Sequence, residues 1–184
     1  MRWAARSGAL IGAALVAGCA GGHAGIRHAP AGPAPVPGRL VPAAAPAGSL
    51  VRVARPDYSD PASVAAAFYA AWAGTDAVHD GPGAYVARCA PLVTASLDQQ
   101  LAASQPASAA WQAMHRDRMT SLAHVRAVTR PAGAPAPTSS VTYLRVYATR
   151  VTTSAAGRTA SSDGITLQLT RSGGRWLVSR LLFY

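Results

Sequence analysis

The apolar pattern of this 184-residue chain changes from helical to alternating near residue 120. Before that point, apolar residues recur at the three- and four-residue spacing of one helix face: Val64, Phe68, Ala71 and Trp72. After it, apolar and polar residues alternate, as they do in strands with one buried face. Helices followed by a run of strands predict an α+β domain, with the helices packed on one face of a curved antiparallel sheet of about four strands.

The first helix has signals at both of its ends. Asp60 is suited to cap the free amides, Pro61 fits the first helical position, and Gly74 is typical of a helix end. Shorter helical segments are expected further along the chain: 84–88, 92–101 and one that begins at Pro106.

Four strands are expected after the pattern changes: 122–130, 141–151, 165–170 and 175–184. Gly157 marks a turn, and Ser172-Gly173-Gly174 is a tight hairpin turn. Within 165–170, isoleucine and leucine alternate with threonine and glutamine, so one side of this strand is expected to face solvent.

Asp60 begins a stretch of the form Asp-Pro-x-x-Val-x-x-x-Phe-x-x-x-Trp, and Gly173 begins Gly-Gly-Arg-Trp-Leu-Val-Ser in the closing hairpin. Together these stretches resemble the nuclear-transport-factor-two-like cone, also called SnoaL-like or cystatin-like. The resemblance implies a cone-like α+β domain over residues 57–184. The family includes isomerases, cyclases and hydrolases, and also non-catalytic modules such as the TcpC-like conjugal transfer proteins. Those transfer proteins usually carry a transmembrane helix.

The first eighteen residues have the layout of an export signal, with a basic start and an apolar run over residues 7–18. A transmembrane helix needs about 20 apolar residues, so this run is short for a membrane span. Val16-Ala17-Gly18-Cys19 resembles the bacterial lipobox. The resemblance implies cleavage between Gly18 and Cys19 and acyl chains on Cys19, which would hold the protein at the extracytoplasmic face of the cell membrane. An ordinary secretory signal is the alternative.

Residues 19–56 predict an Ala/Pro/Gly-rich disordered tether. Proline-rich segments favour extended conformations over helix, and this one is rich in prolines: Pro30, Pro33, Pro35, Pro37, Pro42 and Pro46. His23 and His28 lie in this segment, but two histidines alone do not predict a metal site.

The formal net charge is +10. Removal of the signal with its two arginines leaves 15 arginines against seven aspartates, or +8, which favours contact with anionic partners. The arginines are scattered singly, so no nucleic-acid patch is expected. Arg145, Arg150 and Arg180 lie in predicted strands and are expected to be mostly exposed. An inward face shared by Arg145 and Arg180 would strengthen the hypothesis of an anionic ligand.

A cone enzyme that moves protons near a carbonyl needs a carboxylate and a hydroxyl donor in an apolar pocket. The candidates are three aspartates with either of two tyrosines: Asp76, Asp80, Asp117, Tyr143 and Tyr147. The first two aspartates fall in a Gly/Pro-rich turn and the third lies among arginines, so turn formation and surface charge explain them. The sequence contains no nucleophile elbow, zinc-protease or phosphate-loop motif. We therefore expect no catalytic residues.

The histidines of the predicted domain are His79, His115 and His124, and no pair has the spacing of metal ligands on one helix face. No metal or cofactor is expected. If Cys19 is acylated, Cys89 has no partner in its own chain. We expect Cys89 to be a small buried residue, with an intermolecular disulfide as the alternative.

These observations favour an exported, lipid-anchored accessory protein that acts by protein–protein interaction or assembly, with a secretion or conjugation apparatus as one setting. The first alternative is a module that binds a small hydrophobic or anionic ligand in the cone pocket. The second is an isomerase or cyclase-like enzyme of the cone family.

Overall fold

The computed structural model of the protein describes residues 48–182. The expected signal sequence, the Gly18–Cys19 cleavage and lipidation site, and the tether histidines His23 and His28 lie outside the described residues. Within 48–182, no helix is both long and apolar enough to cross a membrane.

Five antiparallel strands follow one another in chain order across a single sheet: β1 (Thr75–Asp76), β2 (Thr120–Thr129), β3 (Val141–Ser154), β4 (Gly157–Ser172) and β5 (Arg175–Leu182). The α+β class and the antiparallel sheet are confirmed. The sheet has one strand more than the sequence predicted. The extra strand is β1, in which Thr75 and Asp76 pair with the start of β2. Two residues are too few to show an alternating pattern.

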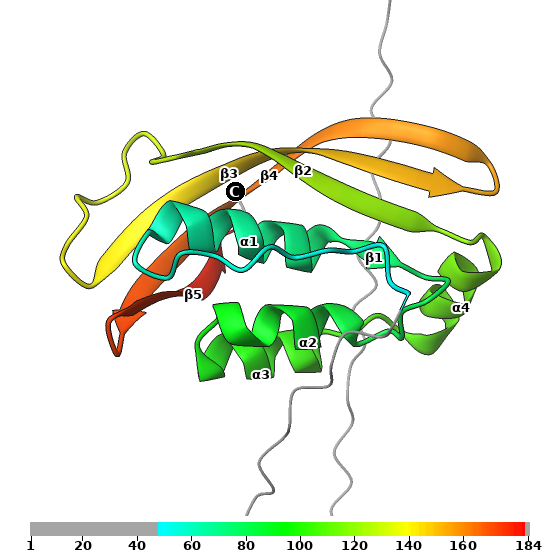
Figure 1. Ribbon diagram of the computed structural model, residues 1–184, viewed down its shortest axis with the longest axis horizontal. Coiled ribbons are helices and arrows are strands. Elements are labelled where there is room, and N and C mark those ends of the chain that lie inside the picture. Colours follow the sequence, from blue (N-terminus) through cyan, green and yellow to red (C-terminus); the bar gives the residue numbers. More distant parts are fainter. Residues whose placement is uncertain (1–47, 183–184) are drawn as a thin grey trace, which may run out of the picture. The chain divides into compact units, whose positions relative to one another are not determined.

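The helices are α1 (Pro61–Ala73), α2 (Ala84–Cys89), α3 (Ala95–Ala103) and α4 (Ser108–Arg116), with a 3₁₀ turn at Ala90–Leu92 between α2 and α3. This turn separates the two helical segments that the sequence predicted at 84–88 and 92–101. Figure 1 shows α1 along the concave side of the curved sheet, with α2 and α3 beyond it on the same side and α4 near one end. We call the opposite side of the sheet its outer face.

Helix α1 begins where Asp60 caps it. The Asp60 carboxylate accepts hydrogen bonds from the amides of Ala62 and Ser63, at 2.9 and 3.1 Å. Val64, Phe68 and Tyr69 of α1 are fully buried in the core. This helix therefore supplies one wall of the core.

The sheet supplies the other wall of the core through alternate residues of its strands: Val146, Ile165, Leu167, Leu169, Trp176 and Val178. These side chains are all buried, and several have no exposed surface. The concave side is thus filled by packed side chains from α1 and the strands. Trp176 and Val178 lie on the same, buried face of β5.

The packed part of the chain starts before residue 57, where the sequence analysis placed the domain boundary. Ser49 and Val51 are buried, and the Leu50 amide donates a 2.8 Å hydrogen bond to Asp76 Oδ2. A Cβ at Gly74 would lie 2.5 Å from Val51 Cγ1, so the end of α1 needs a glycine for this segment to pack. The last residues of the expected tether thus belong to the fold.

Candidate functional site

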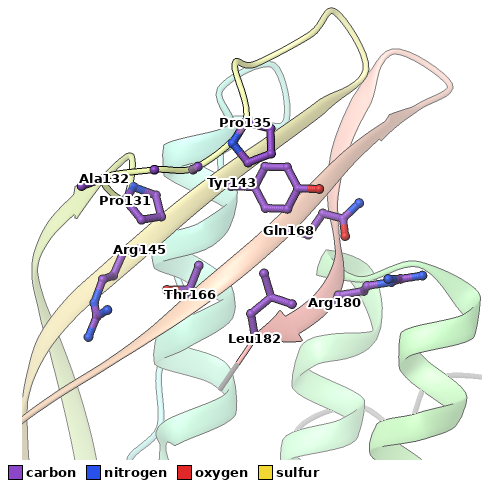
Figure 2. A pocket seen from close by; sticks show the side chains of 11 residues that line it. Pro131, Ala132, Pro135, Tyr143, Arg145, Thr166, Gln168, Arg180 and Leu182 are labelled. Atoms are coloured by element: carbon purple, nitrogen blue, oxygen red, sulfur yellow. The ribbon is translucent and has the colours of Figure 1, made fainter. Parts of the chain in front are cut away.

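A pocket of about 590 Å³ lies on the outer face of the sheet. We call it the outer-face pocket. It is lined by residues from three neighbouring strands and by the loop at 131–135: Tyr143, Arg145, Thr166, Gln168, Arg180 and Leu182. Figure 2 shows the two arginines at opposite sides of the pocket, with Thr166, Leu182 and Gln168 between them.

A β-bulge aims Arg180 into this pocket. Along β5, strict alternation would place Arg180 on the same side as Trp176 and Val178, which are buried. Instead, Leu169 pairs with Val178 while Gln168 pairs with Arg180, so Ser179 is an extra residue in β5. The bulge reverses the alternation beyond Ser179 and turns Arg180 to the outer face.

The loop wall of the pocket is held by its own contacts. The Ala134 amide donates to the Pro131 carbonyl at 3.2 Å, and the intervening Gly133 has a φ of +75°, which a glycine adopts readily. Arg130 also donates a hydrogen bond to the Ala134 carbonyl. The rings of Pro131 and Pro135 fix the φ angles at these two positions. The loop wall of the pocket is therefore formed in the absence of a ligand.

The outer-face pocket is positively charged. Of the described residues that line it, two are arginines and none is acidic. The Arg145 guanidinium lies 5.4 Å from the centre of the Tyr147 ring, and its buried Nε has no hydrogen-bond partner. The sequence predicted that both arginines would be mostly exposed. Arg180 is exposed, whereas Arg145 is half-buried because it lies within the strand array beneath the loop.

Thr166 also departs from the expected solvent-facing pattern, since it is only 5% exposed. It lies on β4 between Arg145 of β3 and Leu182 of β5, and its neighbours cover it. The outer face is therefore partly enclosed around the pocket. Tyr147, next along the same face of β3 from Arg145, is 44% exposed.

Asp76 and Asp80 are buried, which corrects the expectation that they are surface charges in a turn. Asp80 Oδ2 accepts a 2.7 Å hydrogen bond from Arg88 Nη1, and Arg88 Nη2 donates to the Gly74 carbonyl at 3.0 Å. Arg88 lies on α2, and the residue pattern of this segment does not indicate that it pairs with Asp80. The sequence therefore predicted the turn that contains Asp80 but not the guanidinium that neutralises the buried Asp80 carboxylate.

Asp76 organises the segment around the turn. Burial acts to raise its pKa, but hydrogen bonds from the Leu50 amide and from His79 outweigh burial and hold the pKa below its usual value. The contact from His79 Nδ1 to Asp76 Oδ2 is 2.9 Å long. A carboxylate so fully engaged is a structural anchor rather than a free base.

A third polar cluster was missed by the sequence analysis. Arg150 and Asp163 form an ion pair on the concave face, beside the Tyr69 hydroxyl of α1. Burial acts to raise the pKa of Asp163, but the neighbouring Tyr69 hydroxyl, the Gly164 amide and Arg150 lower it overall. A general base at neutral pH needs a raised carboxyl pKa, so this cluster fits a structural ion pair. Arg150 is half-buried, not mostly exposed as expected.

The structure does not bring the candidate carboxylates and tyrosines together. Asp76 and Asp80 lie at the β1 turn, Asp117 is exposed after α4, and Tyr143 and Tyr147 lie on the outer face of β3. The histidines are also dispersed: His79 bonds to Asp76, while His115 and His124 are exposed on α4 and β2. Within residues 48–182, no three histidine, cysteine or acidic side chains cluster as metal ligands.

Cys89 is a free, fully buried thiol in the core, as expected of a small hydrophobic residue. Burial raises its pKa to about 12. The thiol is therefore protonated and poorly reactive in the folded protein.

Comparisons with known proteins give little information on function. No family model matches this sequence, and no curated protein matches it. A solved structure, the intermembrane space region of the chloroplast protein ARC6, aligns with a TM-score of 0.38 and 7% sequence identity. The alignment covers 71% of this chain and 100% of that chain. A similarity this low carries no functional information.

Proposed function

We propose that this protein is an exported accessory protein that is anchored by Cys19 at the outer face of the cytoplasmic membrane. It acts there by binding another protein through the outer face of its sheet, with no catalytic step. The lipobox-like sequence supports the anchor. The single observation that supports the binding role is the tyrosine- and arginine-rich outer face around the outer-face pocket.

Tyrosine and arginine are enriched at protein interfaces because each combines a large contact area with a polar group. Tyr147 is 44% exposed, and its ring is accompanied by the Arg145 guanidinium. Tyr143 and Arg180 extend the same surface across the three strands. The concave side, by contrast, is filled by core side chains, which favours contact through the outer face over a ligand inside the cone.

The setting that the sequence suggests is a secretion or conjugation apparatus, as for the TcpC-like proteins. A lipid anchor with a proline-rich tether would let the domain reach a partner some distance from the bilayer. A pocket of about 590 Å³ with two arginines also favours a second function, the binding of a small anionic ligand on the outer face.

The proposal is tested by crosslinking the tagged full chain in its native cells, followed by pull-down and mass spectrometry. We expect a defined protein to be enriched over the Cys19→Ala variant, which should no longer be held at the membrane. The Tyr147→Ser variant should lose this protein, because the substitution removes an exposed aromatic ring from the outer face.

Leu50→Ser is the matched control, since within residues 48–182 Leu50 is the other large, exposed hydrophobic residue, at 53% exposure, and lies outside the sheet. This variant should retain the partner. Equal recovery with all variants, or loss with both serine substitutions, would contradict binding through the outer face.

A further inference from the structure

We infer that the outer-face pocket binds an acidic segment of the partner protein, an inference that rests on the proposed function and specifies its chemistry. The argument begins with charge. The described buried and half-buried arginines elsewhere are neutralised, Arg88 by Asp80 and Arg150 by Asp163. Arg145 and Arg180 form no ion pair with any residue of the described range. Arg145 is thus a half-buried arginine whose charge no described acidic residue neutralises, and Arg180 adds a second charge to the same pocket.

The positions of the two arginines favour a segment with several carboxylates over a single small anion. Arg145 aligns with Thr166 and Leu182, and Arg180 aligns with Gln168 and Tyr143, two residues further along the strands. With strands about 4.8 Å apart and residues about 3.3 Å apart, the two arginine Cα atoms are roughly 12 Å from each other. In an extended peptide, acidic residues two to four positions apart span about 7–13 Å.

The floor and wall of the pocket suit a peptide backbone between those carboxylates. Gln168 and Thr166 provide side-chain hydrogen-bonding groups, and Tyr143, Leu182 and Pro135 provide apolar surface. The guanidinium groups of Arg145 and Arg180 line the same pocket and carry the charges with which carboxylates of the peptide would pair.

The pocket is built before the ligand binds. The Ser179 bulge fixes the direction of Arg180, and the turn at 131–134 fixes the loop wall. Preformed walls reduce the ordering that binding requires. The bulge and the turn lie far apart in the sequence but form parts of the same pocket.

The test uses the full chain, purified in mild detergent, and fluorescein-labelled decaglutamate as the probe, with decaglutamine as its neutral counterpart. Binding is measured by fluorescence anisotropy at low ionic strength. We expect decaglutamate to bind at least tenfold more tightly than decaglutamine. The double variant Arg145→Gln/Arg180→Gln should weaken decaglutamate binding at least tenfold, with an unchanged circular dichroism spectrum.

Arg116→Gln/Arg158→Gln is the matched control, because it removes the same charge from two exposed arginines that do not line the pocket. It should change the affinity less than twofold. Arg145→Lys/Arg180→Lys keeps the charge and should bind more tightly than the glutamine pair, which separates lost charge from lost folding.

Equal weakening in both glutamine pairs would overturn the inference, since it would show general attraction to a basic protein. Free glutamate and inorganic phosphate are also tested as competitors, at the concentration of charged groups at which unlabelled decaglutamate displaces the probe. Displacement by either of them would overturn the inference and favour a small anion as the ligand. Failure to bind decaglutamate while the cellular partner is still captured through Tyr147 would remove this inference and leave the proposed function standing.

Discussion

The ion pair between Arg88 and Asp80 is the most buried charge pair described in the fold. The Arg88 and Asp80 side chains are 4% and 1% exposed, and their atoms lie 2.7 Å apart. Loss of one partner leaves the other charge buried without compensation, which typically costs about 3–5 kcal/mol. Arg88→Met should therefore lower the free energy of unfolding, measured by urea denaturation, by about that amount.

The double variant Asp80→Asn/Arg88→Met is the control for this prediction. It removes both charges and should recover part of the loss. Asp163→Asn breaks a pair whose side chains are about one third exposed, so its cost should be about 1 kcal/mol or less. Similar losses in Arg88→Met and Asp163→Asn would contradict this ranking.

Asp76 links the stability of the fold to acid pH. Its folded pKa lies below the ordinary value of 3.8, so its stabilising contribution is complete above that pH and is lost as the pH falls through the folded pKa. The difference in unfolding free energy between wild type and Asp76→Asn should shrink as the pH falls below about 4. A difference that stays constant down to pH 3 would show that the carboxylate is not what stabilises the turn.

For single residues, the sequence predicted some roles but could not show which charged side chains are buried and neutralised by a partner. Asp60 as a helix cap and Cys89 as a buried thiol follow from local pattern and composition. The burial of Asp76 and Asp80 does not, because it depends on Arg88 and on the Leu50 amide, which reach the turn only through tertiary packing.

Strand β5 shows how one element sets the binding surface. Deletion of Ser179 would remove the extra residue, so that Val178 and Arg180 become neighbours that still point to opposite faces, with Arg180 on the outer face and Leu181 in the core. Deletion of the paired residue Leu177 would instead reverse the alternation between Val178 and Trp176, which are both buried. We expect the Leu177 deletion to lower the free energy of unfolding by at least about 3 kcal/mol in urea denaturation, and the Ser179 deletion to cost clearly less.

Deletion of Ala136, in the exposed part of the loop between β2 and β3, is the control and should be tolerated. If the Leu177 deletion were as stable as the Ser179 deletion, Ser179 would not be the extra residue of the strand.

Among the elements, strong local signals predicted the right structure. The Asp60–Pro61 pair located α1, and Ser172-Gly173-Gly174 located the β4–β5 turn. The strand β1 was not predicted, because two residues are too few to show an alternating pattern. The bulge at Ser179 was not predicted either, because a single extra residue does not show in the hydrophobic pattern. The outer-face pocket was missed for the same reason, since strict alternation would not place Arg180 beside Gln168.

The whole molecule combines this domain with the proposed lipid anchor. Cys19→Ala should move the protein from the membrane fraction to the soluble or secreted fraction, because two acyl chains hold a protein stably and none remains. Fractionation with immunoblotting measures the shift, and intact mass measures the loss of lipid. Retention of Cys19→Ala in the membrane at unchanged mass would contradict the lipid anchor.

The central claim is that the outer face of the sheet contacts a partner protein in the cell. The most direct measurement is site-specific photo-crosslinking, with benzoylphenylalanine incorporated in place of Tyr147 and, separately, in place of Leu50, both of which are large exposed hydrophobic residues. We predict one protein crosslinked at position 147 and absent at position 50, with the crosslink lost in the Arg145→Gln/Arg180→Gln background. A partner captured equally at both positions, or at position 50 alone, would contradict the account.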